Sequence, residues 1–157
     1  MKFEKNIKIN LNQELYEGMK KCVHKASPNE ACGLVFGDIE KIDIENRSQI
    51  HYIGKKFNCF ESDRKSSVAF LIENFEELNK VLLTANEYGL RLISIFHSHP
   101  SGAHPSGVDR NHMIYLDDFI IKIFKNQIWT IMDASNNELN GFIYFNKEFL
   151  QVDLKIL

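Results

Sequence analysis

Residues 91–109 read RLISIFHSHPSGAHPSGVD, and the rest of the chain is organised around this stretch. An apolar run with strand character ends in HSHP at residues 97–100, and a loop rich in small residues then leads to Asp109. Because successive side chains of a strand point to opposite faces, His97 and His99 share one face, roughly 6–7 Å apart at Cα. Two imidazoles and a returning carboxylate form a ligand set of catalytic zinc sites, in which water takes the fourth position. The stretch therefore predicts a metal site.

Length and composition indicate one globular domain over residues 1–157. The chain has 157 residues, of which 44% are hydrophobic and 25% charged, enough for a sizeable core in a soluble protein. A net charge of -2 disfavours a nucleic acid or an anionic membrane as the main partner. No apolar run approaches the ~18 residues of a membrane helix, and the opening MKFEKNIKINLNQ lacks the apolar core of a secretory signal. We therefore expect a cytoplasmic protein.

The three cysteines, Cys22, Cys32 and Cys59, are odd in number and unrelated in spacing. We interpret them as reduced side chains, as in the cytoplasm, rather than as a disulfide framework. None forms a CxxC pair, so we expect no second, cysteine-based zinc site. Cys32 is expected to be a small core residue rather than a redox group.

Two stretches have the apolar spacing of amphipathic helices. The first covers residues 13–25 with Asn12 as its cap, and the stretch at 27–29 ends it. The second starts at Asn74, where Glu77 three residues later suggests a capping box, and Gly89 suits its C′ position. The residues expected to share a helix face are Leu15, Met19, Cys22 and Val23 in the first and Phe75, Leu78, Leu82 and Ala85 in the second.

Apolar or alternating stretches predict strands between and after these helices. The expected strands are 5–10, 31–36, 41–45, 68–72, the run that ends at His97, 128–133, one beginning at 142, and the tail 150–157 as an edge strand. Gly37-Asp38 reads as a hairpin turn between the second and third of these, and Asn136-Asn137 as another turn. Residues 46–67 are expected to form a long loop or short irregular strand that borders a substrate groove. Interleaved strands and helices predict a three-layer α/β domain around a mixed sheet.

The paired histidines and the Ser106-x-x-Asp109 pattern each have a purely structural explanation as well. Histidines at a strand end can simply be surface or hydrogen-bonded residues, and Ser-x-x-Asp commonly caps a helix. The capping and metal-binding roles can coexist, because a capped helix would hold Asp109 rigidly. His104 and His112 are interpreted as loop and helix-surface residues, with His104 the first substitute ligand if Asp109 is not one.

Glu30 precedes an apolar run, and an isolated glutamate in such a place is usually a solvated end residue. A zinc hydrolase with a His2Asp site, however, needs a base that takes a proton from water and passes it to the leaving group. A carboxylate at the start of a buried strand can do this if it lies within about 3 Å of that water.

The motifs EACGL at 30–34, HSHP at 97–100 and SGVD at 106–109, in this order, resemble the JAMM (MPN-plus) metalloproteases. That family has a distant Glu, then H-[ST]-H, then S-x-x-D. The resemblance extends over most of the chain and implies an MPN fold, which is cytidine-deaminase-like. One departure is that the loop from Pro100 to Pro105 is one residue shorter than is usual in the family.

By this resemblance, His97, His99 and Asp109 bind one Zn²⁺ per chain, and Glu30 is the general base. Ser106 would hydrogen-bond the attacking water or the oxyanion that develops at the scissile carbonyl. The short loop puts the position of Ser106 in question more than that of the histidines.

The resemblance implies a zinc metallopeptidase that hydrolyses a peptide or isopeptide bond at the C-terminus of a ubiquitin-like protein. The compact length is similar to that of the minimal prokaryotic members, so a small sulfur-carrier protein of ubiquitin fold is an alternative substrate. A non-catalytic MPN scaffold is a second possibility, disfavoured because all three ligands and Glu30 are present. A DNA-repair-associated relative with an HxHP motif is a third, and the mildly acidic balance gives it no support.

Overall fold

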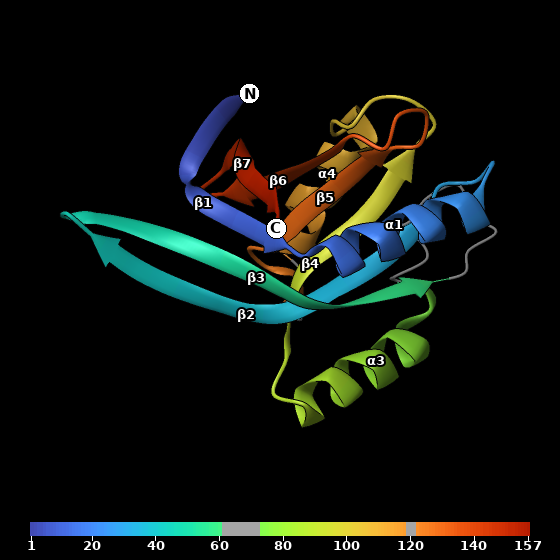
Figure 1. Ribbon diagram of the computed structural model, residues 1–157, viewed down its shortest axis with the longest axis horizontal. Helices are drawn as coiled ribbons and strands as arrows, with labels where there is room; N and C mark the ends of the chain where they lie inside the picture. The colour runs from blue at the N-terminus through green and yellow to red at the C-terminus, as the bar shows by residue number, and fades with distance from the viewer. Residues whose placement is uncertain (61–72, 119–121) are drawn as a thin grey trace.

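The computed structural model describes residues 1–60, 73–118 and 122–157 (Figure 1). In chain order these residues form β1 (Lys2–Leu11), α1 (Gln13–Ala26), β2 (Cys32–Ile44), β3 (Arg47–Phe60), α3 (Phe75–Glu87), β4 (Arg91–His99), α4 (Gly107–Asp117), η1 (Lys122–Phe124), β5 (Ile128–Asp133), β6 (Leu139–Phe145) and β7 (Glu148–Ile156). The strand expected at 68–72 lies outside the described residues. Within the described residues, no helix is long and apolar enough to cross a membrane.

The strands form one mixed sheet in the order β1-β3-β2-β4-β5-β6-β7, which closes into a barrel. The pairs β1–β3, β1–β7 and β4–β5 are parallel, and the others are antiparallel. The mixed sheet with helices is thus as the sequence predicted, whereas the three-layer arrangement stays a prediction. The expectation of an edge strand at the C-terminal tail was wrong, because β7 pairs with β6 on one side and β1 on the other.

Two hydrophobic clusters pack on the sheet, and β4 contributes to both. Ile93 and Phe96 belong to the cluster that α1 covers, whereas Leu92 and Ile95 belong to the cluster that α3 and α4 cover. The residues of each pair are three apart rather than two, because the pairing of β4 with β2 skips Ile93 and interrupts the strict alternation of side chains. The helix residues buried in the clusters are Leu15, Met19, Cys22 and Val23 from α1, Leu78 and Ala85 from α3, and Met113 and Leu116 from α4.

The first predicted helix has the expected bounds and cap. The side chain of Asn12 accepts a hydrogen bond from the backbone N–H of Leu15 at 2.8 Å. In α3, the predicted capping box was wrong: Asn74 holds the N-cap position, but within the described residues its side chain makes no capping hydrogen bond. Phe75 is 43% exposed rather than part of the buried face. Gly89 follows the C-cap Tyr88 with a φ of 71°, as predicted for a C′ glycine.

The predicted turn at Gly37-Asp38 was wrong, because β2 continues through it to Ile44. The chain reverses instead at Glu45 and Asn46, which have φ values of 48° and 64°. The strand pairing shifts between Phe36 and Gly37, and a Cβ on Gly37 would lie 1.8 Å from the carbonyl oxygen of Ile53. This glycine therefore marks a close approach of two backbones rather than a turn.

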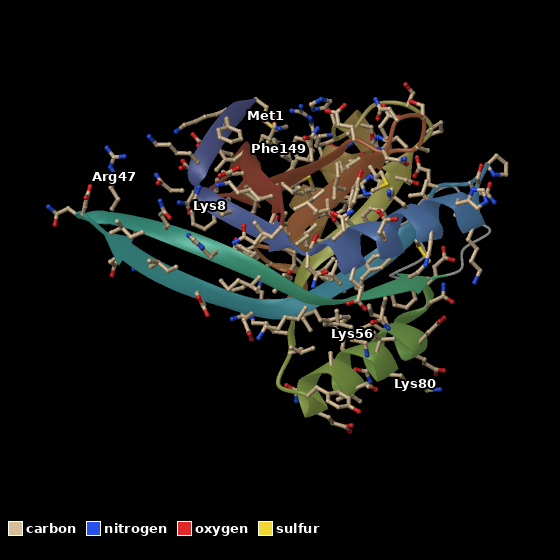
Figure 2. The ribbon with its side chains drawn as sticks, in the orientation of Figure 1. Met1, Lys8, Arg47, Lys56, Lys80 and Phe149 are labelled. Atoms are coloured by element: carbon tan, nitrogen blue, oxygen red, sulfur yellow. A yellow bond between two sulfur atoms is a disulfide. The ribbon has the colours of Figure 1, made fainter. Side chains whose placement is uncertain are left out.

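The loop expected at residues 46–67 was wrong over its larger part, since β3 extends from Arg47 to Phe60, and residues 61–67 lie outside the described residues. β2 and β3 form a long two-stranded ribbon with Arg47 near its tip (Figure 2). β3 begins with the polar residues Arg47, Ser48 and Gln49 at the tip of this ribbon and is interrupted further on by Gly54, Lys55 and Lys56, so its sequence lacks the sustained apolar alternation that signals a strand.

The expectation of three reduced cysteines was also wrong. Cys22 of α1 and Cys59 of β3 form a disulfide with their Cα atoms 5.7 Å apart. They are 37 residues apart in sequence and meet because α1 packs on β3, which spacing alone does not reveal. Cys32 is fully buried in the second cluster, as predicted for a core residue, and burial raises the pKa of its thiol to about 12.

Candidate metal centre

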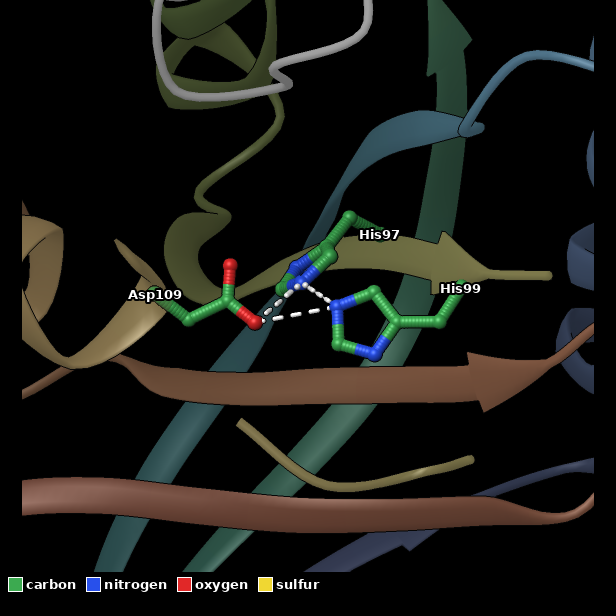
Figure 3. A group of neighbouring side chains, drawn as sticks. All are labelled: His97, His99 and Asp109. Atoms are coloured by element: carbon green, nitrogen blue, oxygen red, sulfur yellow. Dashed lines mark hydrogen bonds and ion pairs between the residues drawn. The ribbon is translucent and has the colours of Figure 1, made fainter. Parts of the chain in front are cut away.

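His97 and His99 lie at the end of β4, the strand between β2 and β5 (Figure 3). β2 places Cys32 opposite His97, and β5 places Asp133 beside His99. Both neighbours of β4 thus fix its register, and a shift by one residue would turn both imidazoles to the other face. The alternation predicted from the sequence therefore holds the two rings on one face.

Asp109 reaches the same place from the first turn of α4. Ser106 is the N-cap of this helix: its Oγ accepts from the N–H of Asp109 at 3.0 Å, and its own N–H donates to Oδ2 of Asp109 at 2.8 Å. This is a complete capping box. The helix start predicted at Ser106-x-x-Asp109 is present, and it fixes the side chain of Asp109.

The three side chains bring one ligand atom each to a common point. Nε2 of His97 lies 3.1 Å from Nε2 of His99 and 3.2 Å from Oδ2 of Asp109, and the last two atoms are 2.9 Å apart. In a tetrahedral zinc site with bonds of about 2.0–2.1 Å, neighbouring ligand atoms are about 3.3 Å apart. The donor set and its spacing therefore fit a zinc ion with one position open. Among the described residues, these three are the group of His, Cys, Asp and Glu that could hold a metal.

Electrostatics keep the carboxylate of this cluster ionised. Burial opposes ionisation of Asp109, but hydrogen bonds from the rings of His97 and His99 outweigh it and hold the pKa of that carboxyl far below its usual range. The hydrogen bond with Asp109 in turn raises the pKa of His99 against the opposing effect of burial. The carboxylate is thus ionised at neutral pH, as metal ligation requires.

Glu30, just before β2, lies beside this cluster. It is partly buried, and this burial raises the pKa of its carboxyl, while the charges of His97 and His99 lower it to a lesser extent. Its neighbour Ala31 is tied to β4, because the N–H of Ala31 donates to Oγ of Ser98 at 2.9 Å and the N–H of Ser98 donates to the Ala31 carbonyl at 3.2 Å. The structure therefore brings a carboxylate from far upstream to the three candidate ligands.

His104 and His112 are not part of the cluster. The ring of His104 lies 5.7 Å from the ring of Phe142, and His112 lies on α4. Asp109 occupies the third position, so His104 is not needed as its substitute.

Two buried residues near the site were missed by the sequence analysis. Ser98, between the histidines, points away from them and anchors the segment of Glu30; the hydroxyl residue in the H-[ST]-H pattern was a usable signal for it. Asp133 ends β5 beside His99 and accepts a hydrogen bond from Gly102 in the following loop. A carboxylate before a turn is common, so nothing in the sequence distinguished Asp133.

A small cavity of about 230 Å³ opens next to the cluster. Its lining includes Ser27 and Pro28 after α1, Ser98 and His99 at the end of β4, and Ser135 after β5. Small and polar side chains predominate there, so the space beside His99 suits a narrow group rather than a bulky apolar one.

Comparisons with known proteins agree with this architecture. Residues 12–141 match the family model of prokaryotic homologs of the JAB domain. The fold is similar to the solution structure of protein DSY2949 from Desulfitobacterium hafniense, with a TM-score of 0.68, 21% identity, and coverage of 95% of this chain and 94% of that one. It is also similar to the crystal structure of AF2198, a JAB1/MPN domain protein from Archaeoglobus fulgidus, with a TM-score of 0.55, 15% identity, and coverage of 96% and 98%.

A comparison with curated proteins found no match. The two solved structures share too little sequence to show more than the fold. The family model, however, covers most of the chain, including Glu30 and all three candidate ligands. This protein therefore belongs to the prokaryotic JAB/MPN domain family and is a minimal member of the JAMM type.

Proposed function

We propose that this protein is a zinc-dependent metallopeptidase that cleaves the peptide or isopeptide bond at the C-terminus of a ubiquitin-like protein. The observation that carries the proposal is the convergence of Nε2 of His97, Nε2 of His99 and Oδ2 of Asp109 at spacings close to those of a tetrahedral zinc site. Glu30 beside the same point supports a hydrolase rather than a structural site.

In the proposed reaction, zinc held by these three residues supplies Lewis acidity, which polarises the scissile carbonyl and lowers the pKa of water. Glu30 takes a proton from the attacking water and delivers it to the leaving nitrogen as the C–N bond breaks. Water thus adds hydroxyl to the acyl carbon and a proton to the amine, and Glu30 ends in its starting state. Partial burial suits this role, because a raised pKa brings the carboxyl closer to the pH at which it must both accept and donate.

Ser106 is proposed to stabilise the oxyanion that develops at the scissile carbonyl. Its Oγ accepts the N–H of Asp109, so its hydroxyl hydrogen is not used in that bond and can be donated. One such donor contributes on the order of 10²–10³ in rate in other hydrolases.

A ubiquitin-like protein is favoured as substrate because its C-terminal tail can be narrow, and the cavity beside His99 is small and lined by small polar residues. A protein conjugate and a sulfur-carrier protein with a C-terminal extension both present such a bond. A non-catalytic scaffold is disfavoured, because the three candidate ligands converge and the carboxylate of Glu30 lies beside them.

The test combines zinc content with cleavage of two substrates. One is a diglycine-ended ubiquitin-like protein fused to a reporter, and the other is a sulfur-carrier protein with a C-terminal extension. We expect about one zinc per chain in the parent and in Glu30→Gln, as a His2Asp site implies, and cleavage only by the parent. Asp109→Ala should lose the zinc.

Each other outcome excludes part of the proposal. A parent without zinc, or an equally active Glu30→Gln, would overturn the mechanism. A zinc-loaded parent that cleaves neither substrate would favour a scaffold. An Asp109→Ala protein that retains zinc tightly would overturn the ligand assignment and redirect attention to His104.

A further inference from the structure

The loop after β4 determines where the ring of His99 points. Nδ1 of His99 lies 3.2 Å from the carbonyl oxygen of Gly102, which places the ring between this carbonyl on one side and the metal cluster on the other. Gly102 has a φ of 89°, a left-handed conformation that glycine adopts without strain. The position of the Gly102 carbonyl is therefore part of what aims Nε2 at the metal.

Asp133 holds this glycine from the neighbouring strand. Its Oδ2 accepts the N–H of Gly102 at 2.7 Å, and the strand register sets Asp133 directly beside His99. The other carboxylate oxygen, Oδ1, accepts from the N–H of Ser135 at 2.8 Å and from its Oγ at 2.5 Å. Both oxygens are thus engaged, and the carboxylate has a fixed direction.

Asp133 is 5% exposed, and a buried carboxylate is costly unless its hydrogen bonds compensate. Hydrogen bonds from Ser135 and Gly102 lower the pKa of Asp133, so it is a charged acceptor. Hydrogen bonds to a charged acceptor are stronger than those between neutral groups. A side chain whose only role was to stabilise the turn after β5 could do so without a charge.

We propose that Asp133 is a positioning residue of the metal centre, acting through Gly102 on His99. The carboxylate fixes Gly102, and the Gly102 carbonyl accepts the proton on Nδ1 of His99. A neutral imidazole has one N–H and one lone pair, so this hydrogen bond leaves the lone pair on Nε2, which faces His97 and Asp109. The inference rests on the metal site of the proposed function, but it concerns a residue that touches neither metal nor substrate.

Asp133 also stabilises the turn after β5 through Ser135. The test must separate this role from the positioning of His99. Ser135 bonds only to Oδ1, whereas Gly102 bonds only to Oδ2. Ser135→Ala therefore removes the hydroxyl contact of the turn and leaves the link to Gly102 intact. Asp133→Ala and Asp133→Leu remove both. Asp133→Asn keeps a single acceptor oxygen, so it can accept from the N–H of Gly102 or from that of Ser135, but not from both.

The first measurement is zinc affinity by competition with a chelator. Asp133→Ala is expected to bind zinc about 10–100-fold more weakly than the parent, the usual effect of removing a partner that orients a metal-binding histidine. Ser135→Ala should bind as the parent does, and Asp133→Asn should fall between the parent and Asp133→Ala. Equal affinity in the parent, Asp133→Ala and Asp133→Leu would overturn the proposal, as would an equal loss in Ser135→Ala.

The second measurement needs no metal. In metal-free Asp109→Ala, the carboxylate that can accept a proton from Nε2 of His99 is absent. At a pH where His99 is neutral, the ¹⁵N shifts of its ring nitrogens in NMR then show which nitrogen carries the proton. We expect the proton on Nδ1, and a proton on Nε2 would overturn the proposal even if the Asp133 variants fail to fold. A parent that binds no zinc would instead refute the proposed function, while the ring proton still tests the hydrogen bond between His99 and Gly102.

Discussion

Ser106 and Asp109 each bind the other's backbone: the N–H of Ser106 donates to Oδ2 of Asp109, and the N–H of Asp109 donates to Oγ of Ser106. The same Oδ2 also faces the rings of His97 and His99. The side chain of Asp109 therefore caps the helix and is at the same time a candidate metal ligand. Capping and catalysis make different demands on Ser106, since the cap needs only an acceptor oxygen, whereas the oxyanion needs a donated hydrogen.

Replacing Ser106 by asparagine separates these demands. The amide oxygen of Asn is as good an N-cap as a serine hydroxyl, so Ser106→Asn should keep α4 and the zinc. It loses the hydroxyl, and we expect the cleavage rate to fall by about 10²–10³. Ser106→Ala, the matched control, should show the same loss of rate and also lose about 1 kcal/mol of stability. Full activity in Ser106→Asn would show that the hydroxyl does not take part in the reaction.

The pH profile of cleavage should report Glu30. Burial raises the pKa of Glu30, so the base must lose its proton at a higher pH than an ordinary glutamate, whose pKa is about 4.3. We expect kcat/KM to rise with pH along an acid limb that lies above that value. A profile that is flat through this range would contradict the assignment of Glu30 as the base.

The raised pKa of Glu30 also predicts the direction in which stability changes with pH. A carboxyl whose pKa is raised by folding favours the folded state while it is protonated, and this advantage is lost as the pH rises through the folded pKa. Glu30→Gln cannot ionise there, so its stability relative to the parent should increase from acidic to neutral pH. Denaturation curves of the metal-free proteins at both pH values measure this difference, and a decrease would have the wrong sign.

The disulfide between Cys22 and Cys59 should make a large contribution to stability. It closes a loop between residues 37 apart in sequence, for which chain entropy gives about 3–4 kcal/mol. We expect a reductant to lower the denaturation midpoint of the parent and to leave that of Cys22→Ser unchanged. A parent that is insensitive to reductant would show that the two thiols remain reduced. Since disulfides are rare in reducing compartments, an oxidised parent would also weigh against the cytoplasmic location predicted from the sequence.

Zinc binding should stabilise the folded protein through Asp109. A ligand that binds only the folded state, at one hundred times its Kd, adds about 2.7 kcal/mol to the free energy of unfolding. The parent should therefore show a higher melting temperature with zinc, and Asp109→Ala should not. The melting temperature of each protein with zinc is compared with that of the same protein in the presence of a chelator. Equal stabilisation of the two would place the bound zinc elsewhere.

The cluster of candidate metal ligands was predictable because most of its chemistry is local in sequence. The two histidines depend on strand alternation alone, and Asp109 on a helix start that the Ser-x-x-Asp spacing signals. Glu30 is different: it lies far upstream, and only the resemblance to a family with a distant glutamate connected it to the site. The fold supplies that connection through the hydrogen bonds between Ala31 and Ser98, and the sequence marks only the Ser98 end of it, as the hydroxyl residue between the two histidines.

The incorrect or missing predictions share a physical cause: the same residue type occurs in several kinds of local structure. Gly37 was taken for a turn, but it relieves a backbone contact with Ile53 within a continuous ribbon. Cys22 and Cys59 looked unrelated because disulfide pairing depends on packing and not on spacing. Asp133 looked like any carboxylate before a turn, since its partner Gly102 is in a different loop.

The closure of the sheet also affects how the domain responds to force. β1 and β7 run parallel, from Lys2 beside Leu150 to Leu11 beside Ile156. A pull that draws the start of β1 away from the end of β7 slides the two strands past each other, so that their hydrogen bonds are loaded together. An antiparallel pair held at adjacent ends would open one bond at a time. The domain is therefore expected to resist stretching along this axis more strongly than its size suggests.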